Sequence, residues 1–255
     1  MSHFPRVIPV LTFRDRLLVK PLRFGSEKYI GDPVNAVRIF NEKQVDELVL
    51  IDLGASENPE SVDLDFVSEI ASEAFMPVGY GGGVNGPDIA RRITAQGIEK
   101  VIVNSSFSPD NRVVTEISDE IGSQSTVVSI DTRKKRFGGY ESLAHRATQK
   151  LNASPIQLAR EAVNQGAGEI LLNFTDRERT FQGYDLQLLS QVCESVPVPV
   201  IALGGARGID DFAAGIAAGA SAVAAGSAFV LQGKHEAVLI TYPRQDEIRT
   251  LGNIK

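Results

Sequence analysis

Short apolar runs alternate with longer amphipathic stretches along the chain. The runs are rich in Val, Ile, Leu or Ala, which is typical of strands buried on both faces of a parallel sheet. They cover residues 6–11, 47–52, 76–80, 100–104, 126–131, 169–173, 198–203 and 222–226. The pattern therefore predicts eight buried parallel strands.

Helical patterns separate most of these runs. Apolar residues recur near helical spacing in residues 33–41, after Asp32 as N-cap and Pro33 at the first helical position. Residues 154–165 show the same features, with Pro155 in the first turn. Eight strand–helix units in 255 residues predict an α/β fold of the (β/α)8 TIM-barrel class.

The second half of the chain repeats the first. Residues 77–83 align without a gap with residues 199–205, an offset of 122, and the same offset pairs Ser105 with Ser227. Each copy would hold four βα units. The repeat favours a barrel of two half-barrels over an open doubly wound sheet, as one domain over residues 1–255.

Composition and charge narrow the function. Lys and Arg number 26 against 32 Asp and Glu, a net charge of −6, which argues against a broad nucleic-acid or anionic-membrane surface. Small anions remain compatible, because backbone N–H groups can bind them. The single cysteine cannot form an intramolecular disulfide, which favours a reducing compartment such as the cytoplasm.

One uncharged segment and the N-terminus bear on localisation. Residues 212–231 carry no formal charge but consist mostly of Ala, Gly and Ser, and Gly219 breaks them. We expect a helix, a turn and a buried strand there, not a membrane span. Residues 1–10 contain no long apolar run and predict no secretory signal.

Glycine and small polar residues follow four of the predicted strands, two in each half. Their positions are Gly82, Gly83, Asn104 and Ser105 in the first half and Gly204, Gly205, Gly226 and Ser227 in the second. In a barrel they would lie at the C-terminal rim, where active sites are built. Glycine alone could serve tight turns. The matched pairs, each with a serine one unit later, favour a ligand with a phosphate at each end.

Carboxylates at the same rim are candidate acids or bases. Asp131 follows a buried run directly and is the best candidate, whereas Asp52 and Asp176 fit helix caps or ion pairs equally well. The counterpart of Asp131 in the first half, at the end of strand one, is Thr12. Only one of the two expected acids is therefore present.

Four charged residues stand at strand starts, at the opposite end of the barrel. They are Arg6, Glu47, Lys100 and Glu169. Spacing alone favours a solvated edge over an ion-paired ring that gates a passage through the barrel. The histidines at positions 3, 145 and 235 are widely spaced and predict no metal site, and nothing indicates a cofactor.

Over nearly its whole length the chain resembles HisF, the cyclase barrel of imidazole glycerol phosphate synthase. The resemblance is carried by residues 6–20, 31–33, 46–56, 81–105, 129–133, 166–185 and 204–229. Residues 176–185, Asp-Arg-Glu-Arg-Thr-Phe-Gln-Gly-Tyr-Asp, are similar to the family's Asp-Arg-Asp-Gly-Thr-x-x-Gly-Tyr-Asp, which favours the cyclase over the related isomerase barrel.

The resemblance implies a partner and a reaction. A HisH-like glutaminase docks on the base of such a barrel, and its ammonia passes a charged gate that matches Arg6, Glu47, Lys100 and Glu169. At the rim the ammonia attacks a bisphosphorylated substrate, and lyase and cyclisation steps follow. With this resemblance, the gate hypothesis outweighs that of a solvated edge.

Departures from the family pattern weaken the cyclase hypothesis. The first catalytic aspartate is Thr12, the Asp-Gly of the phosphate turn is Glu178-Arg179, and a lysine–glycine pair is Lys20-Pro21. Bacterial paralogues of this kind serve surface-polysaccharide synthesis, where with a separate amidotransferase they help form acetamidino groups on sugar nucleotides. Three hypotheses stay open: such a divergent nitrogen-transfer subunit, an ordinary cyclase, and a non-catalytic scaffold that channels ammonia.

Overall fold

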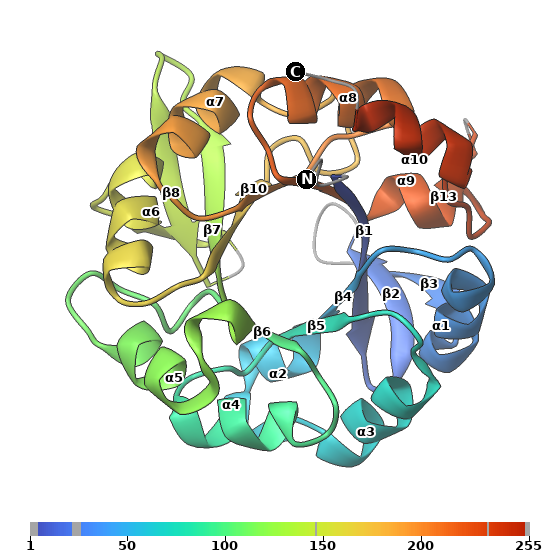
Figure 1. Cartoon of the computed structure of the whole chain (residues 1–255), viewed down its shortest axis with the longest axis horizontal. Coiled ribbons are helices and arrows are strands. Elements are labelled where there is room, and N and C mark those ends of the chain that lie inside the picture. Colours follow the sequence, from blue (N-terminus) through green and yellow to red (C-terminus); the bar gives the residue numbers. More distant parts are fainter. Residues whose placement is uncertain (1–4, 22–26, 146, 234, 253–255) are drawn as a thin grey trace.

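Eight parallel strands close into a barrel in the computed structural model, which describes residues 5–21, 27–145, 147–233 and 235–252 (Figure 1). The strands are β1 (Arg6–Arg14), β4 (Leu48–Asp52), β5 (Val78–Gly81), β6 (Lys100–Val103), β7 (Thr126–Lys134), β10 (Glu169–Phe174), β11 (Val200–Leu203) and β12 (Ala222–Ala225). Each pairs with its neighbour in this order, β12 pairs with β1, and β7 pairs with β10 in the middle of the series. The predicted (β/α)8 barrel is confirmed.

Helices surround the barrel as an outer ring (Figure 1). They are α1 (Pro33–Glu42), α3 (Leu64–Glu73), α4 (Pro87–Thr94), α5 (Val113–Ile121), α6 (Pro155–Asn164), α7 (Leu186–Ser195), α8 (Ile209–Ala217) and α10 (Gln245–Leu251). Shorter helices α2 (Leu53–Glu57) and α9 (Ser227–Val230) follow β4 and β12 at the rim. The ring covers the outer face of the sheet, which lets every barrel strand be buried on both faces.

Matched caps start the helices that follow the first and fifth barrel strands. The Asp32 side chain accepts a hydrogen bond from the backbone N–H of Asn35 at 2.7 Å. Ser154 and Gln157 form a reciprocal capping box, which satisfies two otherwise unpaired donors. A proline stands at the first helical position in both cases, so local sequence fixes where each helix begins.

Antiparallel excursions at the rim interrupt the repeat of strand and helix, and the apolar pattern missed them. β2 (Leu17–Pro21) and β3 (Glu27–Gly31) extend β1, while β8 (Tyr140–Ala144) and β9 (Gln149–Leu151) extend β7. β13 (Leu231–Gln232) and β14 (Ala237–Val238) form a separate hairpin. β3 contains no buried residue, and the apolar residues of β2 and β8 form runs of at most three, which are shorter than the runs of the barrel strands.

Two apolar layers form the core. The larger lies between sheet and helices and includes the fully buried Phe40, Ile70, Phe174 and Phe212. The smaller fills the inside of the barrel. It consists of Ile8, Val10, Val49, Ile102, Val127, Leu171, Ile201, Leu203, Ala222 and Ala224.

The uncharged segment 212–231 folds as expected. It contributes most of α8, then β12, then α9 and the first residue of β13. Within the described part of the chain, none of the helices has the length and apolar character needed to cross a bilayer.

Candidate functional site

A cavity of about 450 Å³ opens at the C-terminal rim of the barrel, where active sites of this fold are built. It brings together most of the rim residues that the sequence singled out. Those among its lining are Thr12, Gly82, Gly83, Asn104, Ser105, Asp131 and Gly226. Gly204, Gly205, Ser227 and Asp176 do not line it. The floor is apolar, since Val10, Ile102 and Leu171 belong to both the cavity lining and the barrel interior.

Asp131 is the buried carboxylate of this cavity. Its side chain is 7% exposed, and its Oδ1 accepts a hydrogen bond from Nδ2 of Asn173 at 2.8 Å. Burial raises its pKa to about 6, against the opposing effect of hydrogen bonds from Asn173 and Asn104. No cation contributes to this balance. A carboxyl group with a pKa close to neutral pH is suited to give and take protons.

Thr12 is the first-half counterpart of Asp131, but its side chain has no carboxyl group. Its hydroxyl donates a hydrogen bond to the carbonyl of Val19 in β2. The hydroxyl is therefore committed to the backbone of the excursion. A threonine cannot act as a carboxylate base in this cavity.

In the turn after β5, in the first half of the barrel, two glycines lie very close to neighbouring parts of the chain. Gly82 and Gly83 have φ of +116° and +70°. A Cβ on Gly82 would collide with the carbonyl of Asp52, and one on Gly83 would lie 2.7 Å from a Val62 methyl. Tight packing thus requires both glycines, whatever they bind. The cavity reaches them, so a ligand could contact this backbone.

Side chains after β6 complete this end of the cavity. Asn104 donates from Nδ2 to the carbonyl of Ser129 at 3.0 Å. The Ser105 hydroxyl donates to Oδ1 of Asn104 at 3.2 Å and accepts from the backbone N–H of His145 at 3.1 Å. These are neutral groups, and no carboxylate bonds to Ser105 in the contacts of the described residues.

The second-half turn repeats the backbone geometry. Gly204 and Gly205 have φ of +105° and +96°. Cβ atoms on them would lie 2.6 Å from the carbonyl oxygen of Phe174 and 2.5 Å from that of Gly183. The backbone N–H of Gly183 also donates to the Gly205 carbonyl at 2.8 Å. This turn is therefore held against the loop that follows β10.

The polar groups near the second turn contact other parts of the chain itself. The Ser227 hydroxyl donates to Oε1 of Glu178 at 3.1 Å, and the same oxygen lies 2.6 Å from Nζ of Lys20. A Cβ on Gly226 would collide with that ammonium group. Gly226 thus makes room for Lys20. Glu178, which the sequence flagged only as a departure from the family pattern, is the residue at the centre of this cluster.

The other two rim carboxylates have structural contacts. Asp52 caps α2 by accepting from the N–H of Ala55 at 2.9 Å, and it accepts from the Tyr80 hydroxyl at 3.1 Å. Burial raises the pKa of Asp52, although these hydrogen bonds oppose it. Asp176 accepts a long hydrogen bond, 3.4 Å, from the backbone N–H of Lys134. A role for Asp176 in ligand binding stays a prediction.

At the base, the four charged residues face one another and form a closed ring. Arg6 pairs with both Glu47 and Glu169. Nζ of Lys100 lies 2.9 Å from Glu47 and 2.7 Å from Glu169. Glu47 and Glu169 are 2% and 4% exposed, so each buried carboxylate is compensated by two cations. The side chains do not splay outward into a solvated edge.

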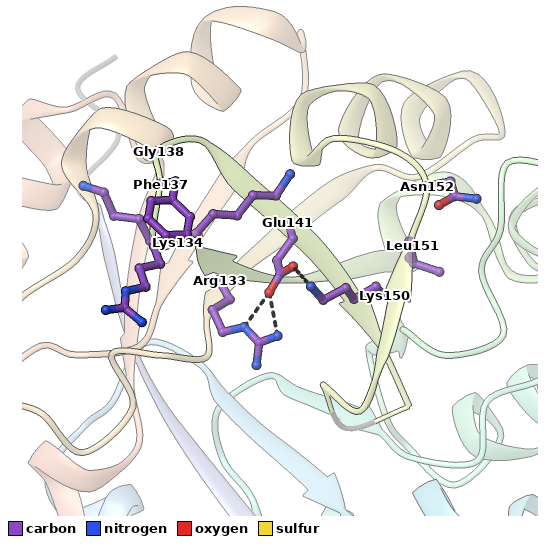
Figure 2. A pocket seen from close by; sticks show the side chains of 10 residues that line it. Arg133, Lys134, Phe137, Gly138, Glu141, Lys150, Leu151 and Asn152 are labelled. Atoms are coloured by element: carbon purple, nitrogen blue, oxygen red, sulfur yellow. Dashed lines mark hydrogen bonds and ion pairs between the residues drawn. The ribbon is translucent and has the colours of Figure 1, made fainter.

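A basic groove of about 660 Å³ lies on the β7–β8 hairpin, and the sequence analysis did not single it out (Figure 2). Arg133 and Lys150 both pair with Glu141, at 2.5 and 2.6 Å. Phe137 is 96% exposed, with the Arg136 guanidinium 5.7 Å from its ring centre. The only sequence signal was the run of four basic residues, 133–136, which is more often a solvated face.

No group of three or more His, Cys, Asp or Glu side chains is arranged to hold a metal ion in the ranges that the structure describes. His3, one of the three histidines considered above, lies outside those ranges.

Comparison with known proteins agrees with the geometry. The profile of the family described as "Histidine biosynthesis protein" matches residues 6–236. The chain is 45% identical to "Putative imidazole glycerol phosphate synthase subunit hisF2" of Pseudomonas aeruginosa, covering 93% of this chain and 95% of that protein. It is 42% identical to a "Putative imidazole glycerol phosphate synthase subunit HisF" of Leptospira interrogans, with coverage of 97% and 98%. It is 36% identical to "Imidazole glycerol phosphate synthase subunit HisF" of Exiguobacterium sibiricum, covering 97% of each.

Proposed function

The chain belongs to the histidine biosynthesis protein family and is a HisF-like barrel, and from this premise we propose that it is the synthase subunit of a glutamine-dependent nitrogen-transfer complex. In this proposal a HisH-like glutaminase docks on the base of the barrel. Its ammonia passes through the barrel to a phosphorylated acceptor in the rim cavity. The names of the relatives, subunits of imidazole glycerol phosphate synthase, support cyclase-type chemistry in one subunit of a complex.

The observation that carries the proposal is the arrangement of charge along the barrel axis. The ion-paired ring of Arg6, Glu47, Lys100 and Glu169 covers the base. Above it the interior cluster is formed by apolar side chains, and the cavity with Asp131 lies beyond. Apolar surroundings favour neutral ammonia over ammonium, because an unpaired charge is costly there. Ammonia would reach the cavity as the nucleophile.

Asp131 would supply the acid–base step at the rim. Its pKa of about 6 suits proton exchange with the acceptor near neutral pH. The absence of an acid at Thr12 means that the two-carboxylate chemistry of the ordinary cyclase is incomplete. We therefore propose a divergent acceptor, and an acetamidino modification of a sugar nucleotide, with a separate amidotransferase, is the candidate that the resemblance suggests. The 45% identity to the relative numbered hisF2, against 36% to HisF of Exiguobacterium sibiricum, supports a divergent paralogue, while the acetamidino acceptor rests on the resemblance alone.

Stimulation of a HisH-like glutaminase tests the nitrogen-transfer proposal. We expect the barrel to raise glutamine hydrolysis by about tenfold or more, the range of ordinary coupling between sites. Phe75 is 87% exposed just before β5 at the base, and Phe137 is 96% exposed at the rim. Phe75→Asp should abolish stimulation and the matched Phe137→Asp should not. No stimulation by the wild-type barrel, or equal loss in both variants, would contradict docking at the base.

Turnover of the bisphosphorylated cyclase substrate with ammonium salt separates the divergent subunit from an ordinary cyclase. Because Thr12 offers no carboxylate, we expect turnover more than about tenfold below that of a cyclase with both acids. A rate within tenfold would instead establish the ordinary cyclase. Thr12→Asp should raise the rate if only the acid is missing. Calorimetry with a bisphosphate that shows no binding at millimolar concentration would point to the non-catalytic scaffold.

A further inference from the structure

The matched rim serines of the two half-barrels have different hydrogen-bond partners. Ser105 and Ser227 correspond in the repeat of 122 residues, as do the glycine pairs that precede them. Among the residues that the structure describes, Ser105 bonds to neutral groups, the Asn104 side chain and the His145 backbone. Ser227 bonds to the carboxylate of Glu178. The equivalent of Glu178 in the first half is Ser56, whose hydroxyl donates to the backbone of Asp52.

Glu178 is held in place by two partners from distant elements. Lys20 comes from the excursion after β1 and lies 2.6 Å from the carboxylate, and Ser227 comes from the start of α9. Lys20 is 6% exposed and Ser227 is 4% exposed. Burial alone would raise the pKa of Glu178, but Lys20 and Ser227 together lower it below its ordinary value. The carboxylate therefore stays ionised at neutral pH and pairs with the buried Lys20, while its own side chain is 33% exposed.

Two cationic side chains near the turn of Gly204 and Gly205 have anionic partners within the chain itself. Lys20 is neutralised by Glu178, and the Arg179 guanidinium pairs with Glu236 at 2.5 Å. A ligand phosphate at Ser227 would have to displace Glu178 or lie beside it, and two anions at one site repel each other. The first turn presents no such carboxylate at Ser105, and it lines the open cavity.

We propose that Glu178 is a specificity-determining residue whose carboxylate takes the place of one ligand anion, so that the cavity accepts a ligand with one phosphate-like end. That end would contact the turn of Gly82 and Gly83 with Ser105, and the remainder of the ligand would extend toward Asp131. The inference rests on the proposed binding of an anionic acceptor in this cavity. A second phosphate on the ligand should then add nothing to its affinity, so that monophosphates and comparable single anions are sufficient ligands.

Phosphate-binding stoichiometry tests this proposal. Equilibrium dialysis with labelled inorganic phosphate should give one equivalent for the wild-type protein and two for Glu178→Gln, which frees Lys20 and Ser227. Glu178→Ser, which copies the first-half residue, should also give two. Glu27→Gln is the matched control, because Glu27 lies in the same excursion as Lys20 but pairs with Arg14, and Arg14 keeps Glu57 as a partner. The control should stay at one equivalent.

A pair of synthetic ligands provides a second readout. Wild-type protein should bind pentyl phosphate and pentane-1,5-diyl bisphosphate with similar affinity. Glu178→Gln should gain about tenfold or more for the bisphosphate alone, the strength of one charge-assisted contact. Thermal unfolding of each variant establishes that it is folded.

Several outcomes would overturn the inference. Two phosphates on the wild-type protein would show that Glu178 yields its place to a ligand. One phosphate on both folded Glu178 variants would show that the second turn is no anion site at all. Absence of phosphate binding to the wild-type protein would show that the turn of Gly82 and Gly83 with Ser105 is not an anion site either. Failure of the nitrogen-transfer proposal would instead appear as absent glutaminase stimulation, with the stoichiometry unaffected.

Discussion

Replacing Asp131 with asparagine should stabilise the protein while it removes the proposed acid–base group. The carboxyl is 7% exposed and faces amides, with no cation among the groups that set its pKa. The Asn173 amide donates to Oδ1, and an asparagine oxygen can accept that hydrogen bond equally well. The substitution therefore removes a buried charge and preserves its main contact.

The pKa gives the size of the effect. The folded value of about 6 against the ordinary 3.8, at 1.36 kcal/mol for each pKa unit, amounts to about 3 kcal/mol. Because the folded pKa is raised, the native state binds the proton more tightly than the unfolded chain. Wild-type stability thus falls as pH rises from about 4 to 6 and the penalty is complete above 6. Asp131→Asn escapes this penalty.

Urea unfolding at two pH values is the assay. At pH 7.5 the Asp131→Asn variant should be more stable by about 3 kcal/mol, and at pH 4 the difference should fall below about 1 kcal/mol. Asn173→Ala is a useful comparison, because it removes the amide donor and should raise the pKa of Asp131 further. A variant that is less stable than wild type at pH 7.5, or a gain independent of pH, would refute the assignment of Asp131 as a buried carboxyl with a raised pKa.

Four further substitutions test the framework of the barrel. Glu169→Gln leaves Arg6 and Lys100 to share Glu47 and should cost about 3 kcal/mol in urea unfolding; a loss under about 0.5 kcal/mol would mean that the ring is not a coupled buried network. Gly204→Ala should cost about 3 kcal/mol, since its φ is +105° and its Cβ would lie 2.6 Å from a carbonyl oxygen. Gly208→Ala, with φ of 170° and open space, should change stability by less than about 1 kcal/mol in the same assay; similar losses at both glycines would contradict the packing argument. Ser154→Ala should cost about 1 kcal/mol through loss of the capping box, and an unchanged thermal unfolding temperature would contradict that role.

The parts of the molecule set by local pattern could be predicted from the sequence. The barrel strands appear in the sequence as apolar runs because both of their faces are buried. The first residues of α1 and α6 follow from a capping residue and a proline. The position of Arg6, Lys100 and Glu169 at one end of the barrel could be anticipated because each begins a strand, whereas their pairing into a ring is favoured only by the family resemblance. In a closed parallel barrel, all strand starts meet at one end.

Contacts between separate loops could not be predicted in the same way. Lys20, Glu178 and Ser227 lie on three elements, and their meeting depends on how the β2–β3 excursion folds over the rim. That excursion has no apolar run to reveal it. Gly226 likewise resembled a phosphate-binding glycine, although the structure shows that the Lys20 ammonium occupies the adjacent space. Only the replacement of the family's Asp-Gly by Glu178-Arg179 hinted at this difference.

The two ends of the barrel bury carboxylates beside different partners, and this difference supports the different roles proposed for the two ends. At the base, Glu47 and Glu169 each pair with two cations, so their buried charges are compensated. At the rim, Asp131 has amide partners and no cation in its balance. Amides stabilise the ionised form only partly, so burial shifts the pKa of Asp131 toward neutrality. Under the proposed function, proton exchange takes place at the rim, and ammonia that enters at the base requires the ion pairs of the ring to rearrange.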